Sequence, residues 1–273
     1  MKVTVRVVNL LAKVSPLGQI AVFLLLLSVL GITAAHRSGF DVPLKKTVVD
    51  FGRSPYYPSG KVRNKLSCYL YPTLMVKEYD EGQKGAEWQS IVPVEKEAGP
   101  TCTQSRATGE HVIQYPEWSG YFNGAKGNLV FFNAADGTNG GLPFVIYDSK
   151  TETKIFEDSA YYSSMWNKKV EESPFNQPRI LTTRDGQVVL RYLRVVEAGC
   201  DLYHKEKAAC WEQLKKRLEL KRTQAPVCSG YTPDSWESVI AYPVEVDLTS
   251  LRRCGPSKGA CAGRRSIIGG ARS

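Results

Sequence analysis

The chain has 273 residues and a formal net charge of +9 at pH 7. Three positive charges precede residue 18 and six follow Asp247, where no acid occurs, so residues 36–248 carry no net charge. The neutral body argues against a nucleic-acid-binding protein, and about 235 residues after the N-terminal segment suffice for one large all-β domain or two small ones.

The first 35 residues have the pattern of a secretory signal. A basic start without acids precedes an apolar run from Gly18 to Ala35, and the small residues at its end predict cleavage near Ala35. The alternative is an uncleaved signal anchor, because the apolar run approaches the length that spans a bilayer. In both cases the positive residues before the run predict that the remaining chain lies outside the cytosol. The expected location is periplasmic or extracellular, or anchored in the inner membrane by residues 18–35.

Residues 36–65 are rich in turn-forming and basic residues. Pro55 and Pro58 disfavour a regular element there, so we expect a linker or a wrapped arm. From Ser67 to Asp80 aromatic and β-branched residues predict extended structure, followed by turn residues in Glu81–Gly85 and a further extended run.

The most regular part of the sequence is Asn128–Ser159. Apolar runs at 127–134, 142–148 and 154–160 are separated by turn-forming residues, which predicts an antiparallel meander of three short strands. Residues 179–196 predict a hairpin, because a two-residue Asp-Gly connection between β-branched runs favours a tight turn. A final alternating strand is expected at 238–248.

Residues 203–221 predict one amphipathic helix. Its apolar face is expected to consist of Ala208, Trp211, Leu214 and Leu218. Its outward face is expected to carry Lys205, Glu212, Lys216 and Glu219. Because the apolar face is narrow and includes a cysteine, a helix that covers the sheet is favoured over one that lies on a membrane surface.

Seven cysteines indicate a disulfide-bearing protein, since bridges are the usual use of cysteine in an exported chain. Cys68 and Cys102 lie far from the others in sequence and are expected to pair. For the next four the sequence leaves three arrangements open: Cys200, Cys210, Cys228 and Cys254. Cys261 is the one expected to stay free.

The sequence provides few candidates for chemistry. Asp136, Asn139 and Asp148 are the residues that a calcium site would use, but they supply too few carboxylates, and a hairpin turn explains them better. His111 and His204 belong to no recognisable catalytic motif. We therefore expect no catalytic residue, no metal and no cofactor.

Two other segments raise a binding hypothesis. Residues 115–122 combine four aromatics with Glu117, which suits a carbohydrate or peptide groove, although packing in a β-core explains such residues more often. The C-terminal residues 251–273 predict a flexible basic tail. Weak contact with an anionic surface would use Arg252, Arg253, Arg264 and Arg265.

Two resemblances accompany these patterns. The segment YDSKTETKIFEDS, within residues 126–159, resembles the outer strands of a single β-propeller blade, with a β-sandwich or open barrel as the competing architecture. The chain from Cys68 through WSGYFNGAKGNLVFF to VIAYPVEVDL resembles small exported bacterial proteins with no assigned function. That resemblance implies export and a disulfide-bearing β domain.

Together these observations predict a mainly β, antiparallel fold with one amphipathic helix and an N-terminal apolar helix. The expected organisation is a signal at 1–35, an arm at 36–65, a β-rich domain at 66–250 and the tail. The leading functional class is a non-catalytic envelope or secreted binding module. The alternatives are a secreted hydrolase with a spatially assembled site and a membrane-anchored periplasmic assembly protein.

Overall fold

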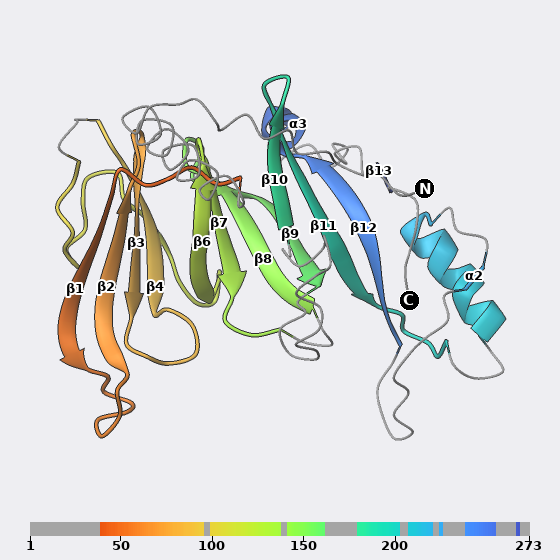
Figure 1. Ribbon diagram of the computed structural model, residues 1–273, viewed down its shortest axis with the longest axis horizontal. Helices are drawn as coiled ribbons and strands as arrows, with labels where there is room; N and C mark the ends of the chain where they lie inside the picture. Colours follow the sequence, from red (N-terminus) through yellow and green to blue (C-terminus); the bar gives the residue numbers. More distant parts are fainter. Residues whose placement is uncertain are drawn as a thin grey trace, which may run out of the picture. The chain divides into compact units, whose positions relative to one another are not determined.

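The computed structural model describes residues 39–95, 99–137, 141–161, 179–202, 207–220, 224–225, 238–254 and 266–267. All of them belong to one compact unit that runs from Gly39 to Ser273. Over these residues the chain is mainly β, with two antiparallel sheets and two short helices (Figure 1). The predicted N-terminal apolar helix, Asn139, His204, Cys228 and Cys261 lie outside the described residues.

The first sheet is a five-stranded meander in the order β1-β2-β3-β4-β5. Its strands are β1 (Lys45–Arg53), β2 (Arg63–Leu70), β3 (Leu74–Asp80), β4 (Trp88–Pro93) and β5 (His111–Ile113). The prediction of an irregular arm over 36–65 is wrong for β1, which pairs with β2 along its whole length. Pro55 and Pro58 come after the strand has ended, in the β1–β2 connection, where no ladder N–H is needed.

The second sheet has eight strands and curls into a half-barrel. Its order is β13-β12-β11-β9-β8-β7-β6, with β10 also paired to β11. The strands from the meander region are β6 (Gly120–Lys126), β7 (Leu129–Ala134), β8 (Gly141–Asp148) and β9 (Thr153–Tyr161). The remaining strands are β10 (Arg179–Arg184), β11 (Gln187–Glu197), β12 (Val239–Asp247) and β13 (Ser266–Ile267).

The strands with the clearest turn chemistry follow the sequence prediction. β7, β8 and β9 form the expected meander, and β10 and β11 form the expected hairpin. At its tip Asp185 and Gly186 both have positive φ, the conformation for which an Asp-Gly turn is suited. β12 alternates between buried and half-buried residues, as its sequence predicts.

The tail prediction for 251–273 is wrong at its start. Helix α3 (Leu248–Cys254) continues directly from β12, and Asp247 accepts a hydrogen bond from the Thr249 N–H as its cap. Leu251 packs against the core of the second sheet, which explains why the helix forms there. Further along, β13 pairs with β12, so the predicted tail also contributes a strand.

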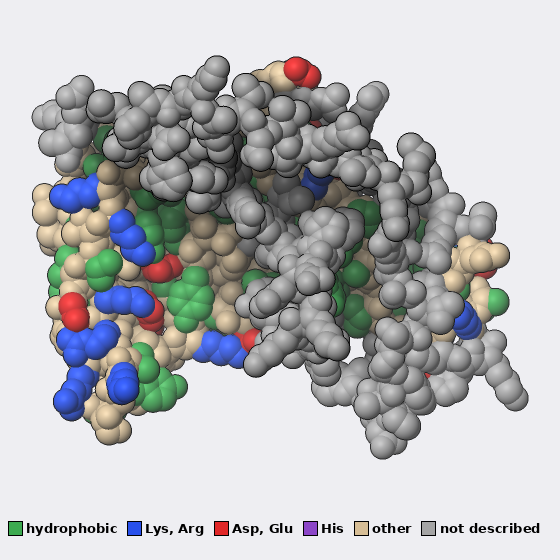
Figure 2. All heavy atoms as spheres, viewed as in Figure 1, with side chains coloured by type: hydrophobic (Ala, Val, Ile, Leu, Met, Phe, Trp, Pro, Cys, Tyr) green, Lys and Arg blue, Asp and Glu red, His purple; other side chains and the backbone are tan. Residues whose placement is uncertain are grey.

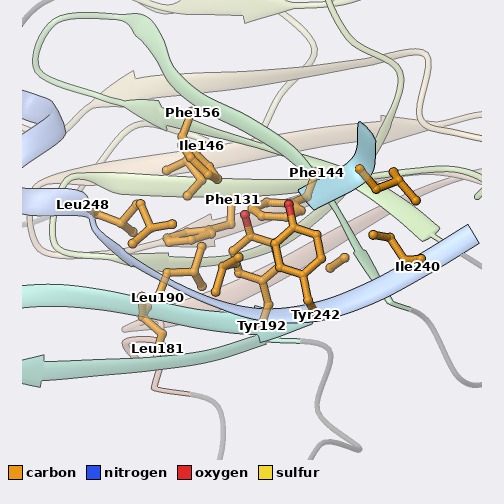
Figure 3. Packing of buried hydrophobic residues seen from close by; sticks show 14 of the residues in the cluster. Phe131, Phe144, Ile146, Phe156, Leu181, Leu190, Tyr192, Ile240, Tyr242 and Leu248 are labelled. Atoms are coloured by element: carbon orange, nitrogen blue, oxygen red, sulfur yellow. The ribbon is translucent and has the colours of Figure 1, made fainter. Parts of the chain in front are cut away.

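The second sheet has two apolar faces. One packs against the first sheet through residues such as Val130, Phe132 and Val145, which meet Val76 and Ile91. The other lines the inside of the curl, where the side chains labelled in Figure 3 gather from β7 to β12. This second cluster is the largest in the described chain.

Helix α2 (Lys207–Leu218) buries one face in the same cluster. Its buried residues are Cys210, Trp211 and Leu214. Ala208 is exposed, so the predicted apolar face is wrong at that residue. The Cys200–Cys210 disulfide selects Cys210 for the buried side, and Glu212 and Lys216 are exposed as predicted. This bridge belongs to one of the three arrangements left open by the sequence, and the pairing of Cys228 lies outside the described residues.

Residues 102–110 cover the face of the first sheet that points away from the second sheet, and a disulfide tethers them there. Cys68 of β2 is joined to Cys102, the pair that the sequence favours. Beneath this segment lies Lys77, fully buried, whose Nζ donates to Glu110 Oε2 at 2.9 Å and to the Ser105 carbonyl at 2.9 Å. The other oxygen of Glu110 accepts from Ser90 Oγ at 2.5 Å.

Further hydrogen bonds surround the Lys77–Glu110 ion pair, from Lys77 to the Ser105 carbonyl and from Ser90 and the Ala107 N–H to Glu110. Such bonds are the condition under which a buried pair is tolerated. Burial opposes ionisation of Glu110, but hydrogen bonds from Ser90, the Ala107 N–H and Lys77 outweigh it and lower the pKa of Glu110. A carboxyl with a lowered folded-state pKa stabilises the protein above its unfolded pKa. That contribution is lost as the pH falls through the folded-state value.

We predict that Glu110→Gln or Lys77→Met alone destabilises the oxidised protein by about 3–5 kcal/mol, because each leaves an unpaired buried charge. The double variant loses less than the sum of the two single losses, since it leaves no charge behind. Urea unfolding at neutral pH measures all three. Glu157→Gln, in the exposed Lys154–Glu157 pair, is the control and changes stability by less than about 0.5 kcal/mol. Additive losses would show that the pair is not coupled.

Candidate interaction surface

The calcium candidates are engaged in local contacts. Asp136 pairs with Lys84 and accepts the Gly137 N–H, while Asp148 is buried and accepts the Lys150 N–H across the β8–β9 turn. Among the described residues no group of three or more His, Cys, Asp or Glu side chains has the arrangement needed to hold a metal. These contacts are those of turn residues.

His111 lies on β5 beside an aromatic ring. Its ring centroid is 6.0 Å from that of Tyr147, and the Tyr147 hydroxyl donates to Glu117 at 2.7 Å. Burial and the neighbouring Glu117 raise the pKa of Tyr147, so its hydroxyl stays protonated. In the described part of the chain no Ser or Cys side chain is hydrogen-bonded to His111.

The aromatic segment 115–122 is divided between core and surface. Trp118 is buried, and Phe122 packs against Tyr69 of the first sheet at a ring-centroid distance of 4.7 Å. Tyr115 is 81% exposed and Glu117 is exposed. Two of these aromatics therefore join the sheets together, and a carbohydrate or peptide groove at this segment stays a prediction.

Sequence reasoning missed a buried polar cluster inside the curl. Asp158 of β9 accepts from the Tyr192 hydroxyl and, at 2.8 Å, from Arg194 Nε. Arg194 also donates to the Tyr242 hydroxyl at 3.4 Å. Burial opposes the charge on Arg194, but Asp158 and Tyr242 raise its pKa overall. Because these groups are bonded to one another, the cluster links β9, β11 and β12 and needs no ligand to satisfy it.

Exposed apolar side chains are concentrated in one short segment. Of the eight large hydrophobic residues that are exposed in the described chain, seven lie between residues 42 and 62. They are Val42, Leu44, Val48, Phe51, Tyr56, Tyr57 and Val62. Contiguous exposed apolar surface on a folded protein commonly marks a site of interaction.

The same segment is strongly basic. Residues 42–65 contain six Lys or Arg and one acid, a net charge of +5 within a body that is neutral as a whole. The basic residues are Lys45, Lys46, Arg53, Lys61, Arg63 and Lys65. Figure 2 shows Lys and Arg side chains gathered over β1 and β2, interspersed with apolar groups. We call residues 42–65 the β1–β2 surface.

Specific contacts hold the β1–β2 surface in place. Lys46 Nζ lies 5.0 Å from the centroid of the Tyr69 ring, and Arg63 pairs with Asp50 across the two strands at 2.8 Å. In the connection, Arg53 Nη1 donates to the Pro58 carbonyl at 3.2 Å, and the Ser54 N–H donates to the Val62 carbonyl at 3.0 Å. The surface is thus a preorganised hairpin, which lowers the entropy cost of binding a partner.

A buried carboxyl lies behind this surface. Glu78 faces the junction of the two sheets and accepts the Phe122 N–H. Burial raises the pKa of Glu78, and the Phe122 hydrogen bond and the nearby Lys65 and Lys46 only partly offset it.

No family model, curated protein or solved structure matches this chain. In the part of the chain that the structure describes, no helix is both long and apolar enough to cross a membrane. The function therefore has to be inferred from the surface itself, and not from the fold.

We predict that Glu78→Gln stabilises the protein at alkaline pH. A carboxyl whose folded-state pKa is raised stabilises the fold at acidic pH, and this contribution is lost as the pH rises through the folded-state value. Glutamine keeps an acceptor for the Phe122 N–H and cannot ionise. Thermal unfolding at pH 4, 6 and 8 should show an advantage for Glu78→Gln that grows with pH. Glu212→Gln on the exposed face of α2 is the control, and an advantage that does not change with pH would contradict the role of Glu78.

Proposed function

We propose that the protein is an exported, non-catalytic binding module of the cell envelope or of the secreted fraction, and that it binds an acidic partner protein through the β1–β2 surface. The observation that carries this proposal is the coincidence of exposed apolar residues and a net charge of +5 in residues 42–65. Apolar contacts supply affinity, and the basic residues select partners of opposite charge.

Export is supported by the two disulfides, because stable bridges form in oxidising compartments. The basic and apolar N-terminal residues support the same route, with cleavage near Ala35. A binding role is favoured over catalysis because the buried polar groups with the most contacts, Asp158 and Glu110, are consumed in bonds that stabilise the fold.

We predict that the purified protein binds immobilised poly-L-glutamate and that Lys45→Glu/Lys46→Glu weakens this binding at least about ten-fold, as expected when two attractive charges become repulsive. Binding also falls as salt is raised. The matched control, Lys150→Glu/Lys216→Glu, has the same change in net charge away from this surface and binds like the natural chain. If both double variants lose binding equally, net charge alone is responsible and the β1–β2 surface is not the site.

We also predict that the exported chain begins close to His36. Intact-mass measurement of the protein from the periplasmic, membrane and culture fractions gives the N-terminus directly. A product in the membrane fraction that retains Met1 would contradict cleavage and show that the chain is anchored.

A further inference from the structure

We infer that the acidic partner binds as an extended segment that adds a strand to the outer edge of β1. This inference rests on the proposed function and specifies how the β1–β2 surface recognises its partner. Strand addition uses backbone hydrogen bonds for affinity and side chains at alternate positions for specificity.

The position of β1 supports this mode of binding. β1 is the terminal strand of the first sheet and pairs with β2 alone among the described strands. Its pairing with β2 is regular from Lys45 to Asp50, and the only shift in register comes between Asp50 and Gly52. A regular stretch of this length presents main-chain groups along its other side that are suitable for pairing with a further strand.

The side chains of β1 define the chemistry of the partner. Lys45 and Lys46 are both exposed at the start of the strand, and Val48 and Phe51 are exposed further along. A strand lying beside β1 would place acidic residues next to the two lysines and apolar residues next to Val48. Cross-strand pairs of these kinds contribute about 0.2–1 kcal/mol each.

A second copy of the chain fits this edge less well. Pairing β1 with another β1 would bring Lys45, Lys46 and Arg53 of the two copies together, against one acid in each strand, Asp50, which already pairs with Arg63. Like charges on neighbouring strands are destabilising. The charge on β1 therefore favours a different, acidic chain as the occupant.

Amide hydrogen exchange tests the inference. The probe is a ten-residue Glu-Val peptide in which pairs of Glu alternate with pairs of Val, added in excess to the full-length oxidised protein. Lys45 and Lys46 are consecutive and lie on opposite faces of β1, so two consecutive acids are needed to lie beside both. We expect the amides in Lys46–Asp50 that do not pair with β2 to exchange at least about ten-fold more slowly, since new hydrogen bonds protect them. The same peptide with alternate backbone nitrogens methylated, which cannot complete the ladder, gives no such protection. A Lys-Val peptide of equal length tests the charge requirement.

The outcomes separate the inference from the proposed function. If poly-L-glutamate binds the natural chain and not Lys45→Glu/Lys46→Glu, the β1–β2 surface is the site. If at the same time the Glu-Val peptide leaves β1 exchange unchanged, or the methylated peptide protects β1 equally well, strand addition is wrong. If neither acidic ligand binds, both proposals fall. If β1 becomes protected on raising the protein concentration alone, with dimers in sedimentation, the occupant is a second copy and the acidic partner is wrong.

Discussion

The junction between the two sheets depends on how the edge of β6 is satisfied. β6 ends the curled sheet, and its outward backbone groups bond to the first sheet without forming a ladder. The Phe122 N–H donates to Glu78, and the Gly120 carbonyl accepts from Gln89 Nε2 and, at 2.9 Å, from the Ala86 N–H. Further along, the Asp41 N–H donates to the Ala125 carbonyl at 2.8 Å. An edge that would otherwise be open to another chain is thereby closed by this chain itself.

The exposure of β1 follows from that junction. The second sheet covers β3, β4 and β5 through Val76, Ile91 and Ile113, and the segment held by the Cys68–Cys102 bridge covers the opposite face. Neither cover extends fully over β1. The pKa values of two buried glutamates, one on each face of the first sheet, shift in opposite directions. Glu110 has several donors and a lowered pKa, whereas Glu78 accepts a single backbone N–H and has a raised pKa. The two groups therefore oppose each other in the pH dependence of stability.

The sequence predicts the elements whose signal is local. The β7–β9 meander, the hairpin with its Asp-Gly turn, β12 and most of α2 follow from periodicity and turn chemistry. Sequence reasoning missed β1 because two prolines in the following connection were weighed against the strand before them. It could not place Lys77 and Glu78, which are adjacent in β3, point to opposite faces and are both buried. Each of these two side chains is covered by chain segments that are distant in sequence, and no local pattern contains that information.

The charge of the β1–β2 surface disappears when charge is summed over the whole body of the protein. Residues 36–248 sum to zero charge, yet 42–65 alone carry +5, and the compensating acids lie elsewhere in the body. The charge of residues 42–65 is visible in the sequence when that segment is taken alone, but the exposure of its side chains depends on the fold.

The features from which we infer that β1 is a docking edge also limit what such an edge accepts. Lysines and a bulge are the devices by which natural proteins prevent edge strands from pairing at random, and β1 has both. Here the lysines are the first two residues of the regular stretch and the bulge follows it, so the backbone from Thr47 to Asp50 remains able to pair. The same two lysines that repel a second β1 attract an acidic strand. Protection against self-association and selection of a partner therefore arise from one arrangement of charge, as expected where specificity depends on disfavouring the wrong partner.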